Sequence, residues 1–239
     1  MTVARVRGAI DRLRAQAWLG AIDEHPAWRR DAPPGPDFNP YSSSLRAAAI
    51  AALDLAGIAA TLLSADVGAI GRVPLGDALA LDLDQCWVRR QYAPARAPAG
   101  HAAHRWHQDG ALGFDFLGTT ATEGALLPML TCWIALTPCG DDAPGIEFAG
   151  SDRTDLLPLA ALADAEVGAC HPRPDRLRPV LEAGDALVFG GGVLHHTHVA
   201  PTMTRDRTSL ELRFFPAAPP PRLRGDRFLN LTRPRRPAA

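Results

Sequence analysis

The chain has 239 residues, of which 47% are hydrophobic and 21% are charged, and its formal net charge is −1 at pH 7. This length suits one sizeable core, and the composition is ordinary for a soluble globular protein. A charge so close to zero gives no general attraction to nucleic acid or to an anionic membrane, so we expect neither as a partner and favour a small-molecule substrate.

The use of particular residue types excludes further mechanisms. All 25 basic residues are arginines, so the chain can form neither a lysine Schiff base nor a lysine-containing phosphate loop. We find no signal-peptide pattern, and no apolar run approaches the roughly 18 residues that a membrane span needs. The cysteines have no metal-binding spacing, which suits a reducing compartment. We therefore expect a cytoplasmic protein. We also expect it to be a monomer or a homodimer. The cysteines are Cys86, Cys132, Cys139 and Cys170.

The first part of the chain, residues 1–83, has a mostly helical pattern. Apolar residues recur at three- and four-residue steps from Val3 to Trp18, which predicts an amphipathic helix. A proline-rich connector, DAPPGPDFNPYSS, follows it. A second helix is predicted over LRAAAIAALDLA, with Ser44 capping its start and Gly57 its end. Helical character returns near ATLLSA.

From about residue 84 the pattern changes to short apolar and β-branched runs separated by Gly, Pro and Asp. Helices first and strands afterwards, without regular alternation, predict a mainly β sandwich or barrel with helical cover. We assign 84–216 to this β core and 217–239 to a Pro- and Arg-rich tail, extended on the surface or partly disordered, all within one domain. The predicted strands are QCWVRRQY, LTCWIALT, GIEFA, DALVFG and SLELRFF.

The segment RWHQDG, residues 105–110, contains a candidate pair of metal ligands. In an extended strand, residues two positions apart point to the same face, so His107 and Asp109 can converge on one ion. A third ligand must come from elsewhere, and GDALVFGGGVLHHTHVAP supplies three histidines after an apolar strand. Two histidines and one carboxylate form the facial triad of non-haem iron enzymes. A histidine-rich surface loop is the alternative interpretation of HHTH.

Four blocks together resemble the phytanoyl-CoA dioxygenase (PhyH)-like family of Fe(II)/2-oxoglutarate-dependent oxygenases. They are RWHQDG, WIALTPCGDDAPGIEFAGSD, GDALVFGGGVLH and RTSLELRFF, in the family's order and approximate spacing. The resemblance implies a double-stranded β-helix (jelly-roll, cupin-like) core. It also implies Fe(II), 2-oxoglutarate as cosubstrate, and O2.

The resemblance further implies that His107 and Asp109 bind the iron. The family places the third ligand ten residues after the Asp of a Gly-Asp turn, which gives His195 here. Arg207, expected to bind the far carboxylate of 2-oxoglutarate, lies twelve residues after His195, where we expect eleven. This spacing keeps His196 as a competitor, and His198 lies on the same strand face as His196.

Further pocket residues follow from the same resemblance. Thr197 is expected to assist Arg207 at the carboxylate, and Gln91 to lie near the cosubstrate. Arginine suits such a role because its forked guanidinium binds a carboxylate through two hydrogen bonds. Trp133 is expected either in the pocket or in the core, and His104 either at the site or in solvent. A group of arginines can grip an anionic substrate, although a solvated face is the simpler expectation. These are Arg89, Arg90, Arg96 and Arg105.

The expected activity is hydroxylation of a C–H bond in a small molecule, with release of succinate and CO2. Two other classes stay open. A zinc- or manganese-dependent isomerase or hydrolase of cupin type would have no use for Arg207 as a dicarboxylate clamp. A non-catalytic binding protein on the same fold would be expected to lack one of the three metal ligands.

Overall fold

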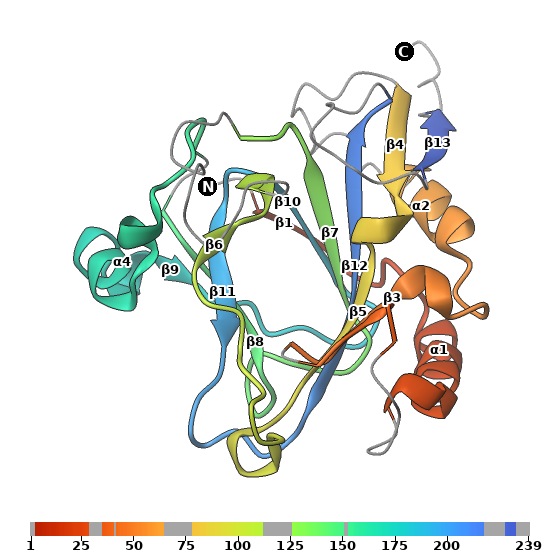
Figure 1. The fold of residues 1–239 in the computed structure, drawn as a ribbon, viewed down its shortest axis with the longest axis horizontal. Coiled ribbons are helices and arrows are strands. Elements are labelled where there is room, and N and C mark those ends of the chain that lie inside the picture. The colour runs from red at the N-terminus through yellow and green to blue at the C-terminus, as the bar shows by residue number, and fades with distance from the viewer. Residues whose placement is uncertain are drawn as a thin grey trace.

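The computed structural model describes residues 3–28, 35–40, 42–64, 78–111, 126–150, 153–217 and 228–232. Within these ranges the protein has two antiparallel β-sheets that face each other, with helices on their outer sides (Figure 1). The chain crosses repeatedly from one sheet to the other. This arrangement is a double-stranded β-helix of the jelly-roll type, so the predicted fold class is confirmed.

The larger sheet is organised around β12 (Arg207–Pro216). This strand pairs with β7 (Leu130–Ala135) on one side and with β5 (Trp87–Gln91) and β4 (Ala78–Asp82) on the other. Side chains of β12 can therefore reach most of the space in front of this sheet. The sheet is completed by β10 (Ala186–Gly190), β1 (Val3–Val6), β3 (Ser44–Arg46), β2 (Phe38–Asn39) and β13 (Phe228–Thr232).

The smaller sheet contains the histidine-rich segment in one of its two central strands. That strand, β11 (Leu194–His198), lies between β6 (His107–Gln108) and β8 (Gly145–Ala149), and β9 (Arg176–Leu177) follows β8. Because β6 and β11 are neighbours, the two histidine-bearing segments that the sequence separates by almost ninety residues lie side by side.

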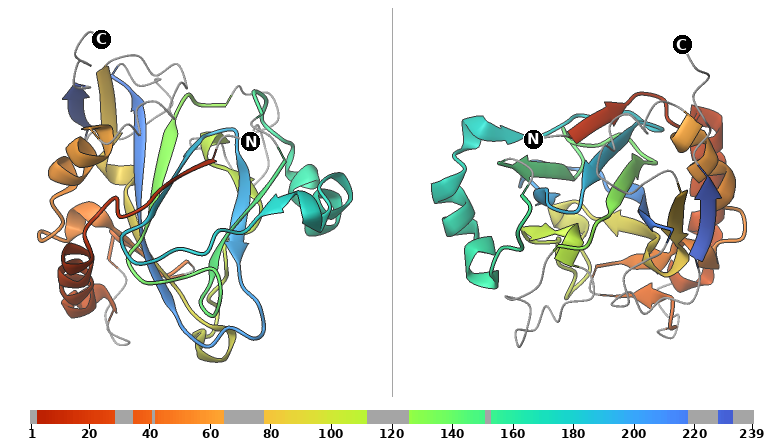
Figure 2. Two further views of the ribbon diagram at one scale, coloured as in Figure 1. Left: turned by 180° about the vertical axis from the view of Figure 1, so that it is seen from behind. Right: turned by 90° about the horizontal axis from the view of Figure 1, so that it is seen from above.

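The helices lie on opposite outer sides of the two sheets (Figure 2). α1 (Arg12–Glu24) and α2 (Leu55–Ser64) cover the larger sheet, whereas α4 (Asp164–Cys170) lies beside the smaller one. The described 3-10 helices are Pro26–Trp28, Ala47–Ala49, Leu83–Gln85, Pro94–Arg96, Asp109–Ala111, Leu159–Leu162 and Arg173–Asp175. None of the described helices combines the length and the apolar character that a membrane span requires.

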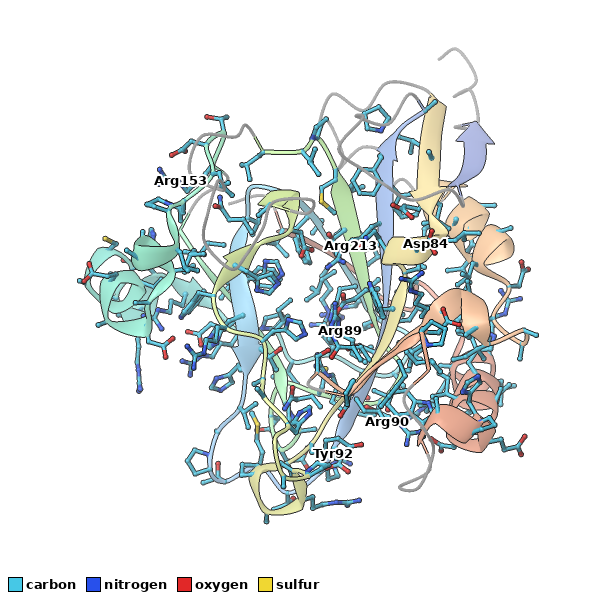
Figure 3. All side chains as sticks on the ribbon, in the orientation of Figure 1. Asp84, Arg89, Arg90, Tyr92, Arg153 and Arg213 are labelled. Carbon is cyan, nitrogen blue, oxygen red and sulfur yellow. The ribbon has the colours of Figure 1, made fainter. Side chains whose placement is uncertain are left out.

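Residues of β12 alternate between two environments. Leu210, Leu212 and Phe214 belong to the core that includes Trp18 and Ile22 of α1. The side chains between them face the other sheet, because successive residues of a strand point to opposite faces. Figure 3 shows the result on neighbouring strands, where Arg89 and Arg213 lie between the sheets and Arg90 lies toward α1. The helical layer therefore stabilises one face while the other is free to carry polar groups.

The prediction of one helix from Val3 to Trp18 is wrong in its first half. Residues 3–6 form β1, which pairs with β10, and the helix begins only at Arg12. Asp185, at the start of β10, accepts hydrogen bonds from the guanidinium of Arg5 (2.6 Å) and the backbone N–H of Gly8 (2.9 Å). These tertiary contacts outweigh the helical periodicity of the segment.

The second predicted helix, between Ser44 and Gly57, is also wrong. Ser44–Arg46 is a strand paired with β5, and α2 begins at Leu55, so Gly57 lies in its first turn. The carboxylate of Asp54 accepts a hydrogen bond from the Gly57 N–H (2.8 Å) and so caps this helix. The helical character predicted near ATLLSA corresponds to the rest of α2. The strands predicted from residue 84 onward are confirmed.

The expected division at residue 84 is not a boundary of the larger sheet, because β1, β2, β3 and β4 all precede it and join that sheet. In the tail, Phe228–Thr232 forms β13 and pairs with β4. The rest of the predicted surface arm, 218–227 and 233–239, lies outside the described residues. That all of this is a single domain stays a prediction.

Gly184→Ala is predicted to destabilise the fold, because Gly184 has a φ of +94° and a Cβ there would lie 2.2 Å from the carbonyl oxygen of Ile10. We expect the free energy of unfolding in urea to fall by about 1–3 kcal/mol. Gly20→Ala is the control. It lies in α1 with no atom within 4 Å of a new Cβ, so stability should rise by about 0.5–1 kcal/mol. Equal effects of the two substitutions would contradict this view of the turn before β10.

Candidate metal centre

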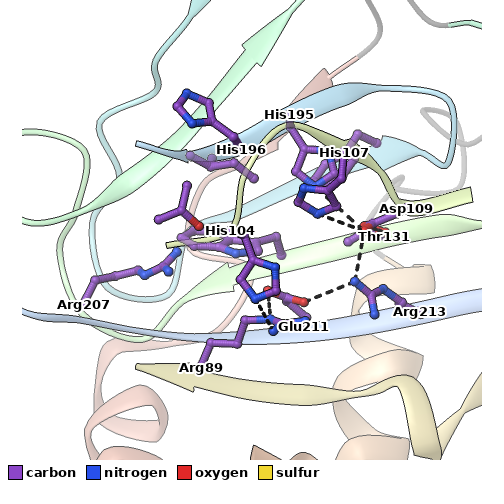
Figure 4. A pocket seen from close by; sticks show the side chains of 14 residues that line it. Arg89, His104, His107, Asp109, Thr131, His195, His196, Arg207, Glu211 and Arg213 are labelled. Carbon is purple, nitrogen blue, oxygen red and sulfur yellow. Dashed lines mark hydrogen bonds and ion pairs between the residues drawn. The ribbon is translucent and has the colours of Figure 1, made fainter. Parts of the chain in front are cut away.

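Three predicted ligands meet between the sheets (Figure 4). His107 and His195 are directly opposite each other on β6 and β11, and Asp109 begins the 3-10 helix after β6. The Nε2 atoms of His107 and His195 lie 3.6 Å and 3.9 Å from Oδ1 of Asp109. Their potential ligand atoms all lie within 4.8 Å of one another. The structure therefore brings together the group that the sequence predicted.

Backbone contacts set the tautomer of both imidazoles. Nδ1 of His107 donates to the carbonyl oxygen of Arg105 (2.7 Å), and Nδ1 of His195 donates to that of Val193 (2.9 Å). A carbonyl can only accept, so each Nδ1 carries a proton, and in the neutral ring the lone pair is on Nε2. Burial lowers the pKa of His195 to about 4, so this ring is neutral near pH 7. Both rings thus turn Nε2, the nitrogen whose lone pair can bind a metal ion, toward Asp109.

Asp109 is a buried carboxylate, 3% exposed, whose two oxygens have separate partners. Oδ1 accepts a hydrogen bond from Arg213 (3.0 Å), and Oδ2 accepts one from the Thr131 hydroxyl (2.6 Å). Burial by itself raises the pKa of Asp109, but the Arg213 guanidinium and the nearby imidazoles outweigh it and hold this pKa well below its usual range. The carboxylate is therefore anionic and fixed in orientation.

This donor set fits a divalent transition metal. Ions with bonds of about 2.0–2.2 Å to nitrogen and oxygen ligands hold adjacent ligand atoms roughly 3 Å apart, so the observed separations need only a small contraction. Two neutral imidazoles and one carboxylate also match the facial triad that leaves three octahedral positions open. Oδ1 of Asp109 has a second lone pair, so it can bind an ion while it still accepts from Arg213.

The competing histidines form a separate group. His196 and His198 do come together, as their shared strand face predicts, but around Glu147 of β8 and not with His107 and Asp109. The Nε2 of His196 donates to Glu147 (2.8 Å), so this nitrogen has no free lone pair. Glu147 also accepts from two guanidinium groups, Arg176 (3.2 Å) and Arg178 (3.0 Å). Its charge is already balanced, which favours His195 as the third ligand.

The expected cosubstrate residues separate into two groups. Arg207 and Thr197 line the same cavity as the three candidate ligands, and so does Trp133, whose ring lies 5.0 Å from the Arg207 guanidinium. Gln91 is opposite Arg207 on β5, but its side chain contacts His101 (2.8 Å) and is not among the described residues of the cavity lining. Arg207 and Thr197 therefore lie at the cavity of the candidate ligands, whereas Gln91 lies beside Arg207 on the neighbouring strand, and the cosubstrate roles of all three stay predictions.

Three lining residues, Thr131, Glu211 and Arg213, were not identified from the sequence. Glu211 is buried and accepts from the Nε of Arg89 (2.6 Å) as well as from Arg213 (3.5 Å). A signal for two of them existed, because Glu211 and Arg213 alternate with leucines and lie four and six residues after Arg207 in RTSLELR, which puts all three on one strand face. Several charges on one face of a buried strand indicate a polar face that a functional site uses.

Comparison with known protein families finds one match. The model of the family described as phytanoyl-CoA dioxygenase (PhyH) matches residues 2–204. This range contains all three candidate metal ligands and ends just before Arg207. Among proteins with curated descriptions, none matches the sequence.

Several solved structures share the fold. The epimerase SnoN in complex with Fe3+, alpha ketoglutarate and nogalamycin RO has a TM-score of 0.56 and 17% identity, over 97% of this chain and 81% of that one. EctD from S. alaskensis with 2-oxoglutarate and 5-hydroxyectoine has a TM-score of 0.59 and 14% identity, over 94% of this chain and 79% of that one. HygX from Streptomyces hygroscopicus with nickel and 2-oxoglutarate has a TM-score of 0.57 and 14% identity, over 90% of this chain and 83% of that one. At these identities the likeness is one of fold.

His195→Ala is predicted to abolish binding of one equivalent of Co(II), followed by its visible absorption under anaerobic conditions. His196→Ala, the neighbouring control, should retain that equivalent, because His196 points to Glu147 instead. Circular dichroism would verify that both variants are folded. Loss of Co(II) binding in His196→Ala alone would show that the third ligand is misassigned.

Glu147→Gln is predicted to lower the free energy of unfolding at pH 7 by about 1.5–3 kcal/mol, since hydrogen bonds to a charged group are lost. The hydrogen bonds from His196 and Arg178 outweigh burial and lower the pKa of Glu147 to about 2. A depressed pKa in the folded state stabilises the protein above the unfolded value of about 4.5, and this contribution is lost as pH falls toward 2. In urea titrations, the difference in free energy of unfolding between wild type and variant should shrink as pH falls from about 4.5 toward 2. A difference that stays constant over this pH range would exclude the Glu147 network as its cause.

Proposed function

The chain belongs to the phytanoyl-CoA dioxygenase family, and on that premise we propose that it is an Fe(II)- and 2-oxoglutarate-dependent dioxygenase. In its simplest form the reaction hydroxylates a C–H bond of a small molecule and releases succinate and CO2. The single observation that carries this proposal is a buried guanidinium without an acid. Arg207 is 3% exposed, lines the cavity of the metal centre, and has no ion-pair partner among the described residues.

A buried cation of this kind requires an anionic ligand. Burial lowers the pKa of Arg207, and its Nε has no hydrogen-bond partner among the described residues. An unpaired buried charge is costly, and a carboxylate that binds the planar fork would compensate for it. A dicarboxylate bound by Arg207 and Thr197 would lie in the cavity that the candidate metal ligands also line. An isomerase or hydrolase that uses the metal alone leaves this arginine unexplained.

The metal would be held by His107, Asp109 and His195. Bound there, Fe(II) would supply the redox chemistry that couples O2 and 2-oxoglutarate to oxidation of the substrate. Arg213 and Thr131 keep the Asp109 carboxylate anionic and fixed. The chain's own contribution is therefore to orient the ligands before the ion binds.

Apolar residues also line the centre, next to His195. The rings of Phe189 and Phe148 lie 4.8 Å and 5.9 Å from the ring of His195, and Ile146 and Phe189 line the cavity. An apolar wall lowers the local dielectric constant, which strengthens the attraction between Arg207 and an anion. It also protects reactive species from solvent.

Hydroxylation is one of several outcomes that the same residues can support. Solved structures with this fold include an epimerase, a carbocyclase and an enzyme with 5-hydroxyectoine bound. The placement of the substrate decides among such outcomes, and hydroxylation requires the fewest additional steps. We further propose the cytoplasm as the location, supported by four free cysteines, of which three are buried. Whether the protein is a monomer or a homodimer stays a prediction.

Anaerobic addition of Fe(II) and 2-oxoglutarate to the wild-type protein is expected to produce a visible metal-to-ligand charge-transfer band. Arg207→Gln should shift the 2-oxoglutarate titration of that band to about 10–100-fold higher concentration, because a charge-assisted contact worth about 1.5–3 kcal/mol is lost.

Arg205→Gln is the matched control for this experiment. Arg205 lies two residues before Arg207 but is exposed and pairs with Asp142 (2.8 Å), so the titration should be unchanged. Absence of the band in wild type would rule out the proposed activity. An unchanged titration in a folded Arg207→Gln protein would rule out the role of Arg207.

A further inference from the structure

A second, larger cavity adjoins the metal centre. Its volume is about 390 Å3, which lies in the range of roughly 300–1,000 Å3 that is typical of small-molecule sites. His107 and Asp109 line both this cavity and the smaller one that contains Arg207. A molecule in the larger cavity therefore lies beside the candidate metal ligands, at a distance from the arginine assigned to 2-oxoglutarate.

Arg89 enters this cavity already fixed in place. Its Nε donates to Glu211 (2.6 Å), and its Nη1 contacts the hydroxyl of Ser44 (2.9 Å) and the Nε2 of His104 (2.8 Å). These contacts occupy three of the five N–H groups of a guanidinium. The two hydrogens on Nη2 have no partner among the described residues. A donor held from three sides loses little conformational freedom when it binds a ligand.

The contact with Arg89 also fixes the tautomer of His104. A guanidinium can only donate, so Nε2 of His104 accepts and the proton of this ring is on Nδ1. His104 lines both cavities, and no hydrogen bond of its Nδ1 appears within the described ranges. His104 therefore carries a second N–H donor, on a ring that contacts Arg89 and lines the cavity.

The charges around the cavity are unbalanced. Its described lining contains the guanidinium groups of Arg89, Arg105 and Arg213 and one carboxylate, Asp109, while Glu211, outside that lining, accepts from Arg89 and Arg213, so the excess positive charge is that of Arg105. The Asp109 carboxylate already accepts from Arg213 and is assigned to the metal. Arg105 is exposed at the cavity and has no ion-pair partner in the described part of the chain. An anion is the ligand charge that such a lining favours.

The other walls are aromatic and aliphatic. Trp106 is 3% exposed and is stacked on His196, with ring centroids 4.0 Å apart, so its position is fixed. Trp87, Leu159 and Leu162 also line the cavity. Such walls bind flat or apolar groups, whereas the polar groups that decide orientation are few.

We propose that this cavity is the substrate site and that it takes a small organic acid. The carboxylate or phosphate of the acid binds Arg89, His104 and Arg105, while its apolar body packs against Trp87 and Trp106. The inference rests on the proposed function only in that oxidation takes place at the adjacent metal centre. Binding of the acid itself needs neither iron nor O2.

Matched pairs of probes test the proposal on the full chain, loaded with Ni(II) and saturating 2-oxoglutarate so that the Arg207 cavity is occupied. The probes are benzoate, 1-naphthoate and indole-3-acetate, each beside its primary amide, with phenyl phosphate as a further arm. Dissociation constants are measured by saturation-transfer NMR. At least one acid is expected to bind ten-fold or more tightly than its amide. The relative affinities of benzoate and phenyl phosphate identify which acid group the site prefers.

Variants locate the binding. Arg89→Gln should weaken the acids at least ten-fold and leave the amides within two-fold. Arg90→Gln is the matched control and should change nothing, because Arg90 bonds to Asp23 and lies over the Trp28 ring, on the side of α1. Arg105→Gln should weaken the acids several-fold, and because Arg105 is exposed this variant keeps the test valid if Arg89→Gln fails to fold.

Three results would overturn the proposal: no acid binds the wild-type protein, the amides bind as tightly as the acids, or a folded Arg89→Gln or Arg105→Gln protein binds the acids like wild type. The same titrations without Ni(II) and 2-oxoglutarate separate this failure from failure of the proposed activity. Acid binding that persists in a protein unable to bind Ni(II) would support the cavity and contradict the metal centre.

Discussion

The site depends on one buried carboxylate. Asp109 is removed from water, and a charge in that position is tolerated only if other groups compensate for it. Arg213 supplies the opposite charge and Thr131 a hydrogen bond, so that the carboxylate stays ionised and keeps one direction. Backbone carbonyls hold a proton on Nδ1 of both imidazoles, so in the neutral rings the lone pairs lie on the nitrogens nearest to Asp109. Without that anion, the two histidines alone would offer a metal ion no negative charge.

The fold makes this arrangement possible because the two faces of β12 have different surroundings. Its leucines face α1 and α2 and contribute to the main core, whereas Arg207, Glu211 and Arg213 face the smaller sheet. Apolar packing on one face therefore offsets the cost of burying charge on the other. The three charged groups have different contacts: Arg213 fixes Asp109, Glu211 fixes Arg89 at the second cavity, and Arg207 has no ion-pair partner among the described residues.

Much of this was predictable from local sequence patterns, and the failures have physical causes. The strands after residue 84 follow from alternation within short segments, and His107 and Asp109 do lie together, although Asp109 begins a 3-10 helix and does not continue the strand of His107. The segment that begins at Ser44 could not be predicted in this way. Its local sequence suits a helix, but pairing with β5 makes it a strand. The contact of Gln91 with His101 was not predictable, because His101 lies in a loop that no pattern specifies. The contact between Arg213 and Asp109 was not predictable, because it depends on where β12 lies relative to Asp109. The two residues are more than a hundred positions apart, so only the topology of the sheets brings them together.

The most direct test of this account is an anomalous diffraction map at the iron edge, from crystals grown anaerobically with Fe(II) and 2-oxoglutarate. The account predicts a single peak bonded to Nε2 of His107, Nε2 of His195 and the Asp109 carboxylate, with the diacid extending from it to Arg207. A peak instead between Glu147, His196 and His198, or a diacid bound away from Arg207, would contradict it.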